Sequence, residues 1–447
     1  MIPDGVKTFY FFAKYRLYKR DAISYYRKLQ EQQRLSTDEL EHLNWEKRKK
    51  LLRHAYENVL YYRSKFKSIG LHPEDIAHPD DYCKVPLLTR KDIRENFGRI
   101  ISKGAGPKEL YLSSTGGSTG EPLKVMLDKR VPEHPFGWLI RSWWGVGCGL
   151  NEAIVRRLED IGTTARFVKD ALWWPARKIR LDASSMKPQD IENFLRKFNK
   201  AHPVILWGYA GAIDHVAFFA EQTSINPAAP KAVSVTSSPI SEIQRNRIER
   251  VFHAPVYDQY GCCEVPWLAA QCRQKQGLHI FHGARLIEFT DDSGHPKAVG
   301  EVGNIVITDL ENYGFPFIRY LVGDMGRSLP GRCRCGINLP LMDKVKGRQT
   351  DLVRLPNGTC LSGDYLTTIF DDFPDAVKAF QVRQKTDYSI KLRYIPGPDR
   401  EKCSAATKKV HDKLLEKTGF QVQITMEPTD FIPHDRGKLR YIISELA

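Results

Sequence analysis

Hydrophobic and polar positions alternate along this chain with a period that changes from one segment to the next. Residues 20–70 follow the helical period, and residues 36–39 (Ser-Thr-Asp-Glu) have the spacing of a capping box. From about residue 78 to 330, short apolar strands alternate with helical stretches. Examples are strands at 204–207 and 232–236, followed by helices at 212–221 and 240–252. This alternation predicts an α/β fold with much parallel sheet.

A smaller module begins after a break near Gly347 and Arg348. Just before it, residues 300–308 alternate apolar and polar side chains, which predicts an exposed antiparallel strand. The pattern after the break predicts a strand at 351–354, a turn at 356–358, a helix, a strand at 389–395, a helix at 401–418 and a strand at 421–426. We therefore expect two domains. Residues 1–348 form a large α/β domain with mostly parallel sheets and a helical segment at 1–75, and residues 349–447 form a small mobile α+β domain.

Size and charge narrow the classes of partner. The 447 residues exceed what one hydrophobic core usually supports. Lysine and arginine outnumber aspartate and glutamate by 68 to 53, a net charge of +15, which favours anionic partners such as nucleotides, coenzyme A or acidic carrier proteins. No dense basic block resembles a nucleic-acid-binding arm, so we expect no nucleic-acid partner. No apolar run reaches the roughly 18–20 residues that a membrane span needs.

Cysteine usage indicates a reducing compartment. The nine cysteines are odd in number, and the chain opens without a signal peptide. We therefore expect reduced thiols and a cytoplasmic protein.

The N-terminus carries an aromatic and basic segment. Residues 9–12 (Phe-Tyr-Phe-Phe) lie among Lys7, Lys14, Arg16, Lys19 and Arg20. One interpretation is a terminal helix docked on its own domain. The other is peripheral contact with a membrane surface, for which a basic aromatic helix is suited.

The first candidate site is the run Ser-Ser-Thr-Gly-Gly-Ser-Thr-Gly-Glu-Pro at residues 113–122. Leu110 and Leu112 precede it and Leu123 and Val125 follow in alternation, which predicts a loop between two strands. Glycines allow close backbone approach and hydroxyls donate hydrogen bonds, so the loop can cradle phosphate oxygens. It is not a Walker loop, because no Gly-Lys-Ser/Thr ends it. The alternative interpretation is a flexible turn.

Four further motifs follow in order. Residues 257–264 (Tyr-Asp-Gln-Tyr-Gly-Cys-Cys-Glu) come at the end of a strand that starts at Ala254, where ligands of α/β sheets bind. Asp324 follows a glycine, and its carboxylate can accept hydrogen bonds from both hydroxyls of a ribose. Residues 346–351 lie at the domain break, and residues 435–440 place Lys438 in a glycine turn. Taken singly, a tyrosine-rich strand end is also explained by core packing, and the last motif by a solvated basic tail.

A separate constellation consists of Cys272, His279, Cys333 and Cys335. Soft thiolates and one imidazole at four positions suit tetrahedral zinc in a structural role, because no coordination position stays open for chemistry. The alternative is free buried thiols.

The order and spacing of the five motifs resemble those of the adenylate-forming superfamily: acyl-CoA synthetases, peptide-synthetase adenylation domains and luciferases. Within it, the chain is most similar to phenylacetate–CoA ligases and to relatives in capsular polysaccharide biosynthesis, over nearly its whole length, including residues 61–63 (Tyr-Tyr-Arg) and 85–90 (Val-Pro-Leu-Leu-Thr-Arg). The resemblance implies an ATP- and magnesium-dependent ligase. Such an enzyme converts a small carboxylic acid to its acyl-AMP and transfers the acyl group to coenzyme A, to a carrier-protein phosphopantetheine thiol or to an amine.

The resemblance also implies residue roles. The phosphates of ATP would contact the loop residues Ser114, Thr115, Gly116, Gly117, Ser118, Thr119 and Gly120; Glu121 stands where family loops often carry lysine. The nucleotide would also contact Ser237, Ser238, Pro239, Tyr257, Asp258, Gln259, Tyr260, Gly261, Asp324 and Arg348, with Tyr260 on adenine and Asp324 on ribose. Glu264 would hold magnesium, and Lys438 would neutralise charge on the α-phosphoryl group. Thr350 occupies the hinge position, which is usually Asp or Lys.

Other functions stay open from the sequence. Trp143, Trp207 and Tyr209 are candidates to wall the acyl pocket, although core packing explains them equally well. A catalytically degenerate nucleotide-binding protein, or a membrane-associated protein of a polysaccharide pathway, is the alternative to an active ligase. A homodimer is compatible with the sequence.

Overall fold

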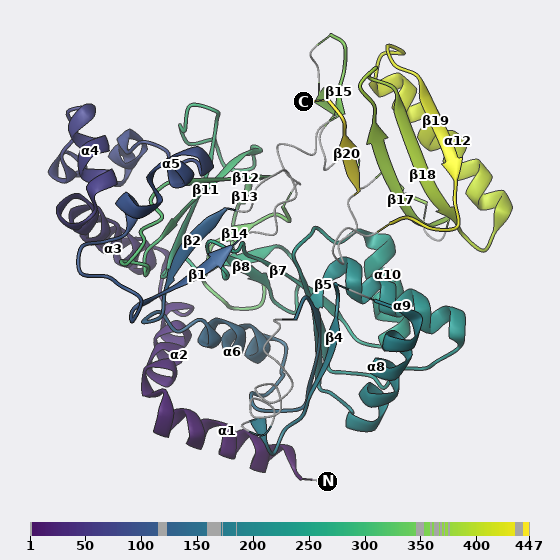
Figure 1. Ribbon diagram of the computed structural model, residues 1–447, viewed down its shortest axis with the longest axis horizontal. Coiled ribbons are helices and arrows are strands. Elements are labelled where there is room, and N and C mark those ends of the chain that lie inside the picture. The colour runs from purple at the N-terminus through teal and green to yellow at the C-terminus, as the bar shows by residue number, and fades with distance from the viewer. Residues whose placement is uncertain are drawn as a thin grey trace. The chain divides into compact units, whose positions relative to one another are not determined.

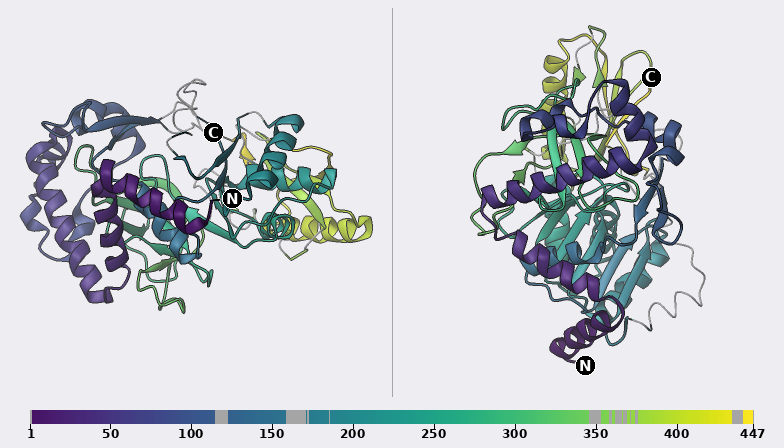
Figure 2. Two further views of the ribbon diagram at one scale, coloured as in Figure 1. Left: turned by 90° about the horizontal axis from the view of Figure 1, so that it is seen from below. Right: turned by 90° about the vertical axis from the view of Figure 1, so that its left-hand side faces the viewer.

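A computed structural model describes residues 2–114, 123–158, 171, 173–184, 186–345, 353–357, 360–361, 366, 369–370, 372–373, 376–433 and 441–446 (Figures 1 and 2). The chain divides into two units. The first, here the mixed unit, contains residues 12–145 and 259–345. The second, here the parallel-sheet unit, contains residues 1–11, 146–258 and 346–447. Helix α1 (Asp4–Tyr18) and strand β7 (Val256–Tyr260) each run from one unit into the other.

The mixed unit begins with the helices that the periodicity predicts. They are α2 (Arg20–Gln32), α3 (Thr37–Asn58) and α4 (Leu60–Ser68). Two 3-10 turns, at Pro73–Asp75 and Pro79–Lys84, and helix α5 (Arg90–Ile100) follow beyond the predicted range. The predicted capping box is confirmed: Glu39 N donates to Ser36 Oγ (3.2 Å), and Ser36 N donates to Glu39 Oε2 (2.8 Å). These two bonds satisfy backbone donors that the first turn of α3 cannot pair internally.

Strands complete the mixed unit. A hairpin of β1 (Leu110–Ser114) and β2 (Lys124–Asp128) precedes α6 (His134–Trp143). The end of β7 pairs with β8 (Ala269–Gln271), and antiparallel pairing continues through β9 (Leu278–Ile280) and β14 (Leu341–Met342) to β13 (Ser328–Leu329). A separate antiparallel sheet has the order β10 (Arg285–Thr290), β11 (Gly303–Asp309), β12 (Tyr320–Gly326).

The prediction for residues 300–308 is half wrong. The segment forms an antiparallel strand, β11, but every residue of β11 is buried. Its polar positions have side-chain partners: the amide of Asn304 donates to the exposed Asp292 (2.9 Å), and Thr308 Oγ1 lies 3.0 Å from the hydroxyl of the buried Tyr82. Because β11 is the central strand of its sheet, its alternation reflects polar groups inside the protein, not a solvent-facing side.

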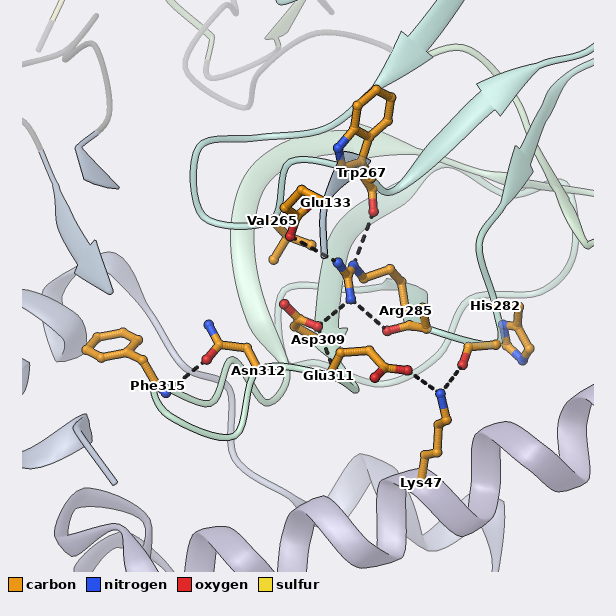
Figure 3. A network of polar contacts seen from close by, with 12 residues as sticks. Lys47, Glu133, Val265, Trp267, His282, Arg285, Asp309, Glu311, Asn312 and Phe315 are labelled. Carbon is orange, nitrogen blue, oxygen red and sulfur yellow. Dashed lines mark hydrogen bonds and ion pairs between the residues drawn. The ribbon is translucent and has the colours of Figure 1, made fainter. Parts of the chain in front are cut away.

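A buried cation links β10 to β11 (Figure 3). The Arg285 side chain is fully buried, and its Nη1 lies 2.5 Å from Asp309 Oδ1. Its Nε donates to the carbonyl of Trp267 (3.2 Å). Nearby, Lys47 from α3 pairs with Glu311 and donates to the carbonyl of Gly283 (2.6 Å). A charge without water is tolerated only when partners such as these surround it.

The parallel-sheet unit contains the predicted parallel strands. The order is β4 (Lys178–Asp182), β3 (Glu152–Arg156), β5 (Ile205–Tyr209), β6 (Ala232–Thr236) and the start of β7, with every pair parallel. Helices α8 (Pro188–Ala201), α9 (Ala210–Thr223) and α10 (Glu242–Phe252) lie beside these strands (Figure 1). Their apolar faces share one core with the sheet, for example Phe198, Leu206 and Ile248.

The C-terminal part is an α+β module, as predicted. A four-stranded sheet has the order β19 (Ile424–Pro428), β18 (Ile390–Pro396), β17 (Val377–Gln384), β20 (Ile442–Ser444), and α12 (Arg400–Lys417) packs against it (Figure 2). A short hairpin, β15 (Val353–Arg354) with β16 (Cys360–Leu361), precedes it. Sequence patterning missed β17 and β20. The boundary at 348/349 lies outside the described residues and stays a prediction.

Removing one partner of the buried Arg285 pair should destabilise the protein. For Asp309→Ala we expect the free energy of unfolding to fall by about 3–5 kcal/mol, because an uncompensated guanidinium stays buried. A matched control is Glu192→Ala, which breaks the exposed pair between Glu192 and Arg196 (2.6 Å) and should cost about 0–1 kcal/mol. Urea denaturation measures both. Equal effects would contradict the importance given to the buried pair.

Glu133, the residue before α6, should make stability depend on pH. Its Oε1 lies 3.8 Å from Arg285 Nη2, and its Oε2 is buried without a hydrogen-bond partner among the described residues. Burial raises the pKa of Glu133 from 4.5 to about 7. The folded protein then binds this proton more tightly than the unfolded chain, so the group lowers stability as pH rises from about 4.5 to 7.

Glu133→Gln cannot undergo this titration. The free energy of unfolding of Glu133→Gln minus that of the unmodified protein should therefore increase with pH between about 4.5 and 7 and level off above that range. Chemical denaturation of both proteins across this range measures the difference, and other titrating groups cancel. A difference independent of pH would disprove the assignment.

Candidate functional site

The predicted phosphate loop connects two paired strands. Strands β1 and β2 are antiparallel, with Ser113 opposite Val125 and Ser114 opposite Lys124, as the alternation of leucines predicts. The loop residues Thr115, Gly116, Gly117, Ser118, Thr119 and Gly120 lie outside the described residues, so their assignment to phosphate stays a prediction. At the base of the loop, Ser113 Oγ donates to the carbonyl of Cys263 (3.4 Å). The hairpin therefore reaches the segment that carries Glu264.

Strand β7 is longer than predicted. It continues to Tyr260, whereas the sequence placed its end at residue 257. Its first three residues pair in parallel with β6, and Gln259 and Tyr260 pair antiparallel with β8. A change of partner along the strand keeps the polar residues Asp258 and Gln259 in ordered backbone.

A tight turn follows β7 and places Glu264. Cys262 N donates to the carbonyl of Val265 (3.0 Å), which closes the turn. A Cβ at Gly261 would lie 2.0 Å from the carbonyl oxygen of Pro266, so this position requires glycine. Gly261 thus has a backbone role that is independent of any contact with nucleotide.

The structure brings Tyr260, Glu264 and Asp324 into one polar cluster within the mixed unit. Glu264 is 1% exposed, and its Oε1 accepts a hydrogen bond from the Tyr320 hydroxyl (2.7 Å). Tyr260 donates its hydroxyl to Asp324 Oδ2 (2.9 Å). Strand β12 carries both Tyr320 and Asp324, two positions on each side of Val322, so one strand serves both carboxylates.

Sequence reasoning missed two members of this cluster. Arg90, at the start of α5, lies with Nη2 at 3.8 Å from Glu264 Oε1 and donates to the carbonyl of Val322 (3.3 Å). Tyr320 is fully buried. Burial, with the neighbouring Glu264 carboxylate next in effect, raises the pKa of Tyr320 far above its usual range, so the hydroxyl stays protonated and donates. Both residues lie in segments that resemble the family, but nothing in the sequence pairs them with Glu264.

Other predicted nucleotide residues lie in the parallel-sheet unit. Ser237, Ser238 and Pro239 directly follow β6, and Ser237 has a left-handed backbone with φ of 83°. Tyr257 and Asp258 lie on β7, opposite Ser234 and Val235 of β6. The C-terminal ends of these parallel strands are the usual ligand edge of such a sheet. Arg348, Thr350 and Lys438 lie outside the described residues, and their roles stay predictions.

The predicted acyl-pocket residues have different surroundings. Trp207 and Tyr209 lie on one face of β5, and the Arg156 guanidinium lies 5.2 Å from the centroid of the Trp207 ring. In the mixed unit, Trp143 Nε1 donates to Gln33 Oε1 (2.7 Å), and its ring stacks on Phe281 with centroids 5.9 Å apart. The described contacts of Trp143 are those of a packing residue. An acyl-pocket role for the three residues stays a prediction.

The four side chains of the predicted Cys/His zinc site lie close together in the structure. The ligand atoms of Cys272, His279, Cys333 and Cys335 all lie within 4.8 Å of one another. Cys272 Sγ is 3.5 Å from Cys333 Sγ, and Cys335 Sγ is 3.3 Å from His279 Nε2. In a tetrahedral zinc site with Zn–S bonds of about 2.3 Å, two sulfur atoms lie about 3.8 Å apart. The separations between the ligand atoms here are close to that value.

Surrounding groups orient the histidine of this cluster. His279 Nδ1 lies 3.3 Å from the carbonyl of Leu339, a contact that a protonated Nδ1 satisfies and that directs Nε2 toward the sulfurs. Burial lowers the pKa of His279 to about 4, so the imidazole is neutral and able to bind a metal. Burial raises the pKa of Cys272 to about 12. Burial thus disfavours the charged thiolate of Cys272, and a bound cation would offset this effect because it stabilises the thiolate.

Comparisons with known proteins agree with this architecture. The family model for the CapK C-terminal domain matches residues 353–445. The structure of 2-hydroxyisobutyryl-CoA ligase in the postadenylation state, in complex with R3-HIB-AMP, aligns with a TM-score of 0.76 and 16% identity over 93% of this chain and 91% of that one. The chain therefore has the fold of the adenylate-forming ligases.

Two relatives in sequence indicate which proteins with this fold the chain resembles. Phenylacetate–coenzyme A ligase of Escherichia coli (strain K12) is 28% identical over 332 residues, which cover 71% of this chain and 73% of the relative. Protein CapK of Staphylococcus aureus is 23% identical over 381 residues, covering 81% and 80%. The resemblance inferred from the sequence is confirmed: this chain is similar to phenylacetate–CoA ligases and to protein CapK, and it has the fold of the adenylate-forming ligases.

The hydrogen bond from Tyr320 to Glu264 should contribute measurably to stability. Tyr320→Phe removes the nearest donor to a buried carboxylate, and we expect the free energy of unfolding to fall by about 1–3 kcal/mol. Tyr18→Phe is the matched control, because Tyr18 is 84% exposed and its change should stay within about 0.5 kcal/mol. Urea denaturation separates the two outcomes. A loss no larger than that of the control would contradict the role given to Tyr320.

Proposed function

We propose that this protein is an ATP-dependent ligase that activates a carboxylic acid as its acyl-adenylate and transfers the acyl group to the thiol of coenzyme A. The main observation in support is the polar cluster of Tyr260, Glu264 and Asp324. The base of the β1–β2 hairpin contacts the segment that carries Glu264, through the hydrogen bond from Ser113 to Cys263. The similarity to phenylacetate–coenzyme A ligase of Escherichia coli and to the structure of 2-hydroxyisobutyryl-CoA ligase supports the same chemistry.

The reaction needs positioning and charge stabilisation. An oxygen of the substrate carboxylate attacks the α-phosphorus of ATP, and the bond from that phosphorus to the pyrophosphate oxygen breaks. The acceptor thiol then attacks the acyl carbon and releases AMP. Negative charge collects on the α-phosphoryl oxygens in the first step, and Lys438 would neutralise it.

The cluster supplies groups suited to the nucleotide. Tyr260 offers a ring for adenine, and Asp324 offers two oxygens for the ribose hydroxyls. Glu264 would hold magnesium, which when bound offsets phosphate charge. Both described contacts of this carboxylate, from Tyr320 and Arg90, are made to Oε1. The loop residues 114–120, Ser237, Ser238, Pro239 and Arg348 complete the proposed contacts.

Movement of the C-terminal module would separate the two half-reactions. Thr350 occupies the position at which we expect a hinge, and Lys438 lies on the module beyond it. Rotation about a hinge is a common way to exchange one set of groups at a site for another. A carrier-protein thiol or an amine is the alternative acceptor, and the net charge of +15 is compatible with coenzyme A or an acidic carrier.

Lys438→Ala tests the catalytic assignment. With a panel of carboxylic acids, the unmodified protein should catalyse acid-dependent exchange of labelled pyrophosphate into ATP. Lys438→Ala should lower the exchange rate by about 100-fold or more, the usual cost of removing a group that stabilises transition-state charge. Lys408→Ala is the control, since Lys408 is exposed on α12.

Two results would contradict parts of this proposal. Full exchange in Lys438→Ala would reject the role of Lys438. ATP binding without exchange for any acid would favour the degenerate nucleotide-binding protein.

We also propose that Cys272, His279, Cys333 and Cys335 hold a structural zinc ion. Three sulfurs and one imidazole nitrogen match a closed tetrahedral site. The ion would connect the end of β8 and the middle of β9 to the loop between β13 and β14, where Cys333 and Cys335 lie.

Metal analysis of the purified protein tests the zinc proposal. About one zinc per chain is expected, and Cys335→Ser should lower both the zinc content and the midpoint of thermal unfolding. Cys403→Ser is the control, because Cys403 is buried on α12 in the other unit and should leave zinc content unchanged. A metal-free protein of unchanged stability after chelation would reject the site.

A further inference from the structure

Helix α1 has two apolar faces, and one of them is already covered. Phe11 is buried, and its ring meets Trp173 edge-on with centroids 5.6 Å apart. On the same side, Thr8 Oγ1 donates to the carbonyl of Cys148 (3.0 Å). A Cβ at Gly149 would lie 2.3 Å from Phe11 Cβ, so the helix is held closely along this face. The docked helix expected from the sequence is therefore present.

The opposite face of α1 exposes a second apolar stripe. Val6, Phe9, Tyr10 and Leu17 have the spacing i, i+3, i+4 and i+11, which places them on one side of an α-helix. Phe9 is 71% exposed and Leu17 is 74% exposed. The docked face cannot account for these residues, since at 100° per residue they point away from Phe11.

A further exposed aromatic residue extends this stripe. Trp174 is 56% exposed, and its ring meets Tyr10 edge-on with centroids 5.7 Å apart. Single exposed hydrophobic residues are common on protein surfaces, but aligned aromatic and aliphatic residues on one helix face mark an interaction surface.

Basic side chains surround the stripe. By helical geometry Arg16 and Lys14 flank it on opposite sides, and Lys19 and Arg20 follow its C-terminal end. The first 20 residues contain five basic residues and a single acidic one, Asp4, which pairs with Lys7 at 3.2 Å. Long basic side chains beside an apolar stripe can reach anionic headgroups while the stripe enters the interface.

The charge pattern also distinguishes between partners. A second copy docking through the same stripe would offer no acidic side chain to Arg16, Lys19 and Arg20, because Asp4 is the single acidic residue among the first 20 and pairs with Lys7. A zwitterionic lipid surface would use the aromatic residues but not the basic ones. Among the described residues no helix is long and apolar enough to cross a bilayer.

We propose that α1 binds the surface of an anionic phospholipid membrane through Val6, Phe9, Tyr10 and Leu17, with Arg16, Lys19 and Arg20 contacting the headgroups. The helix lies in the plane of the interface, because its other face is docked on the protein. Figure 2 shows α1 in purple, with the N-terminus at its end. The surface is independent of the proposed ligase site, so either proposal can fail without the other.

Vesicle co-sedimentation of the full-length protein tests this surface. Vesicles of phosphatidylcholine with phosphatidylglycerol should pellet the protein, whereas vesicles of phosphatidylcholine alone should bind it about tenfold or more weakly. Added salt should release it, since the charge contribution is screened. Equal binding to both vesicle types, or no binding to either, would overturn the proposal.

Paired variants separate the two contributions. Phe9→Ser combined with Leu17→Ser should weaken binding to anionic vesicles by about tenfold or more, because both side chains are exposed and available to the interface. Leu60→Ser combined with Phe420→Ser is the matched control, with exposed residues of similar size on α4 and after α12. Arg16→Glu with Lys19→Glu should abolish the preference for anionic lipid, and Lys408→Glu should retain it.

Thermal unfolding and light scattering complete the test. All variants should unfold at the temperature of the unmodified protein, because the changed side chains are exposed. The protein should have the same mass in solution with and without Phe9 and Leu17. A dimer that Phe9→Ser and Leu17→Ser dissociate would assign the stripe to self-association and overturn the membrane proposal.

Discussion

The buried carboxylate of Glu264 is the constraint on which the candidate site depends. At 1% exposure it requires partners, and it obtains them from Tyr320 on β12 and Arg90 at the start of α5. These two contacts bring distant chain segments to the turn after β7. Tyr260 then binds Asp324, so the same strand that supplies Tyr320 also positions the second carboxylate. Two acidic groups are thus held at defined places before any ligand arrives, which is the preorganisation that the proposed nucleotide and cation would require.

A second buried charge supports the strand that carries this cluster. Arg285 on β10 pairs with Asp309 on β11, and β11 pairs in turn with β12. The network in Figure 3 is distinct from the candidate site, and it orders the sheet from which Tyr320 and Asp324 project. The Cys/His constellation belongs to another sheet: His279 lies on β9, Cys272 directly follows β8, and Cys333 and Cys335 lie between β13 and β14. Buried polar groups therefore determine much of the geometry of the mixed unit.

Local patterns in the sequence predicted what depends on neighbouring residues. The capping box at Ser36, the β1–β2 hairpin, strand β6 and helix α12 all follow from short-range spacing. The pairing of Arg90 with Glu264 was out of reach, because 174 positions separate them and no local signal links the two. The burial of β11 was misjudged for a related reason, since Thr308 finds its partner, Tyr82, in a distant segment. Motif order, in contrast, indicated the superfamily without any structure.

In the first step of the proposed reaction, a substrate carboxylate attacks the α-phosphorus of ATP. The most direct measurement uses a carboxylic acid labelled with oxygen-18 in its carboxyl group, together with ATP, magnesium and coenzyme A. If the acid is adenylated, the AMP released carries one labelled oxygen, which mass spectrometry detects, because the attacking oxygen stays on phosphorus when the thiol takes the acyl group. Label in inorganic phosphate, with ADP as the nucleotide product, would contradict adenylation and indicate attack on the terminal phosphate.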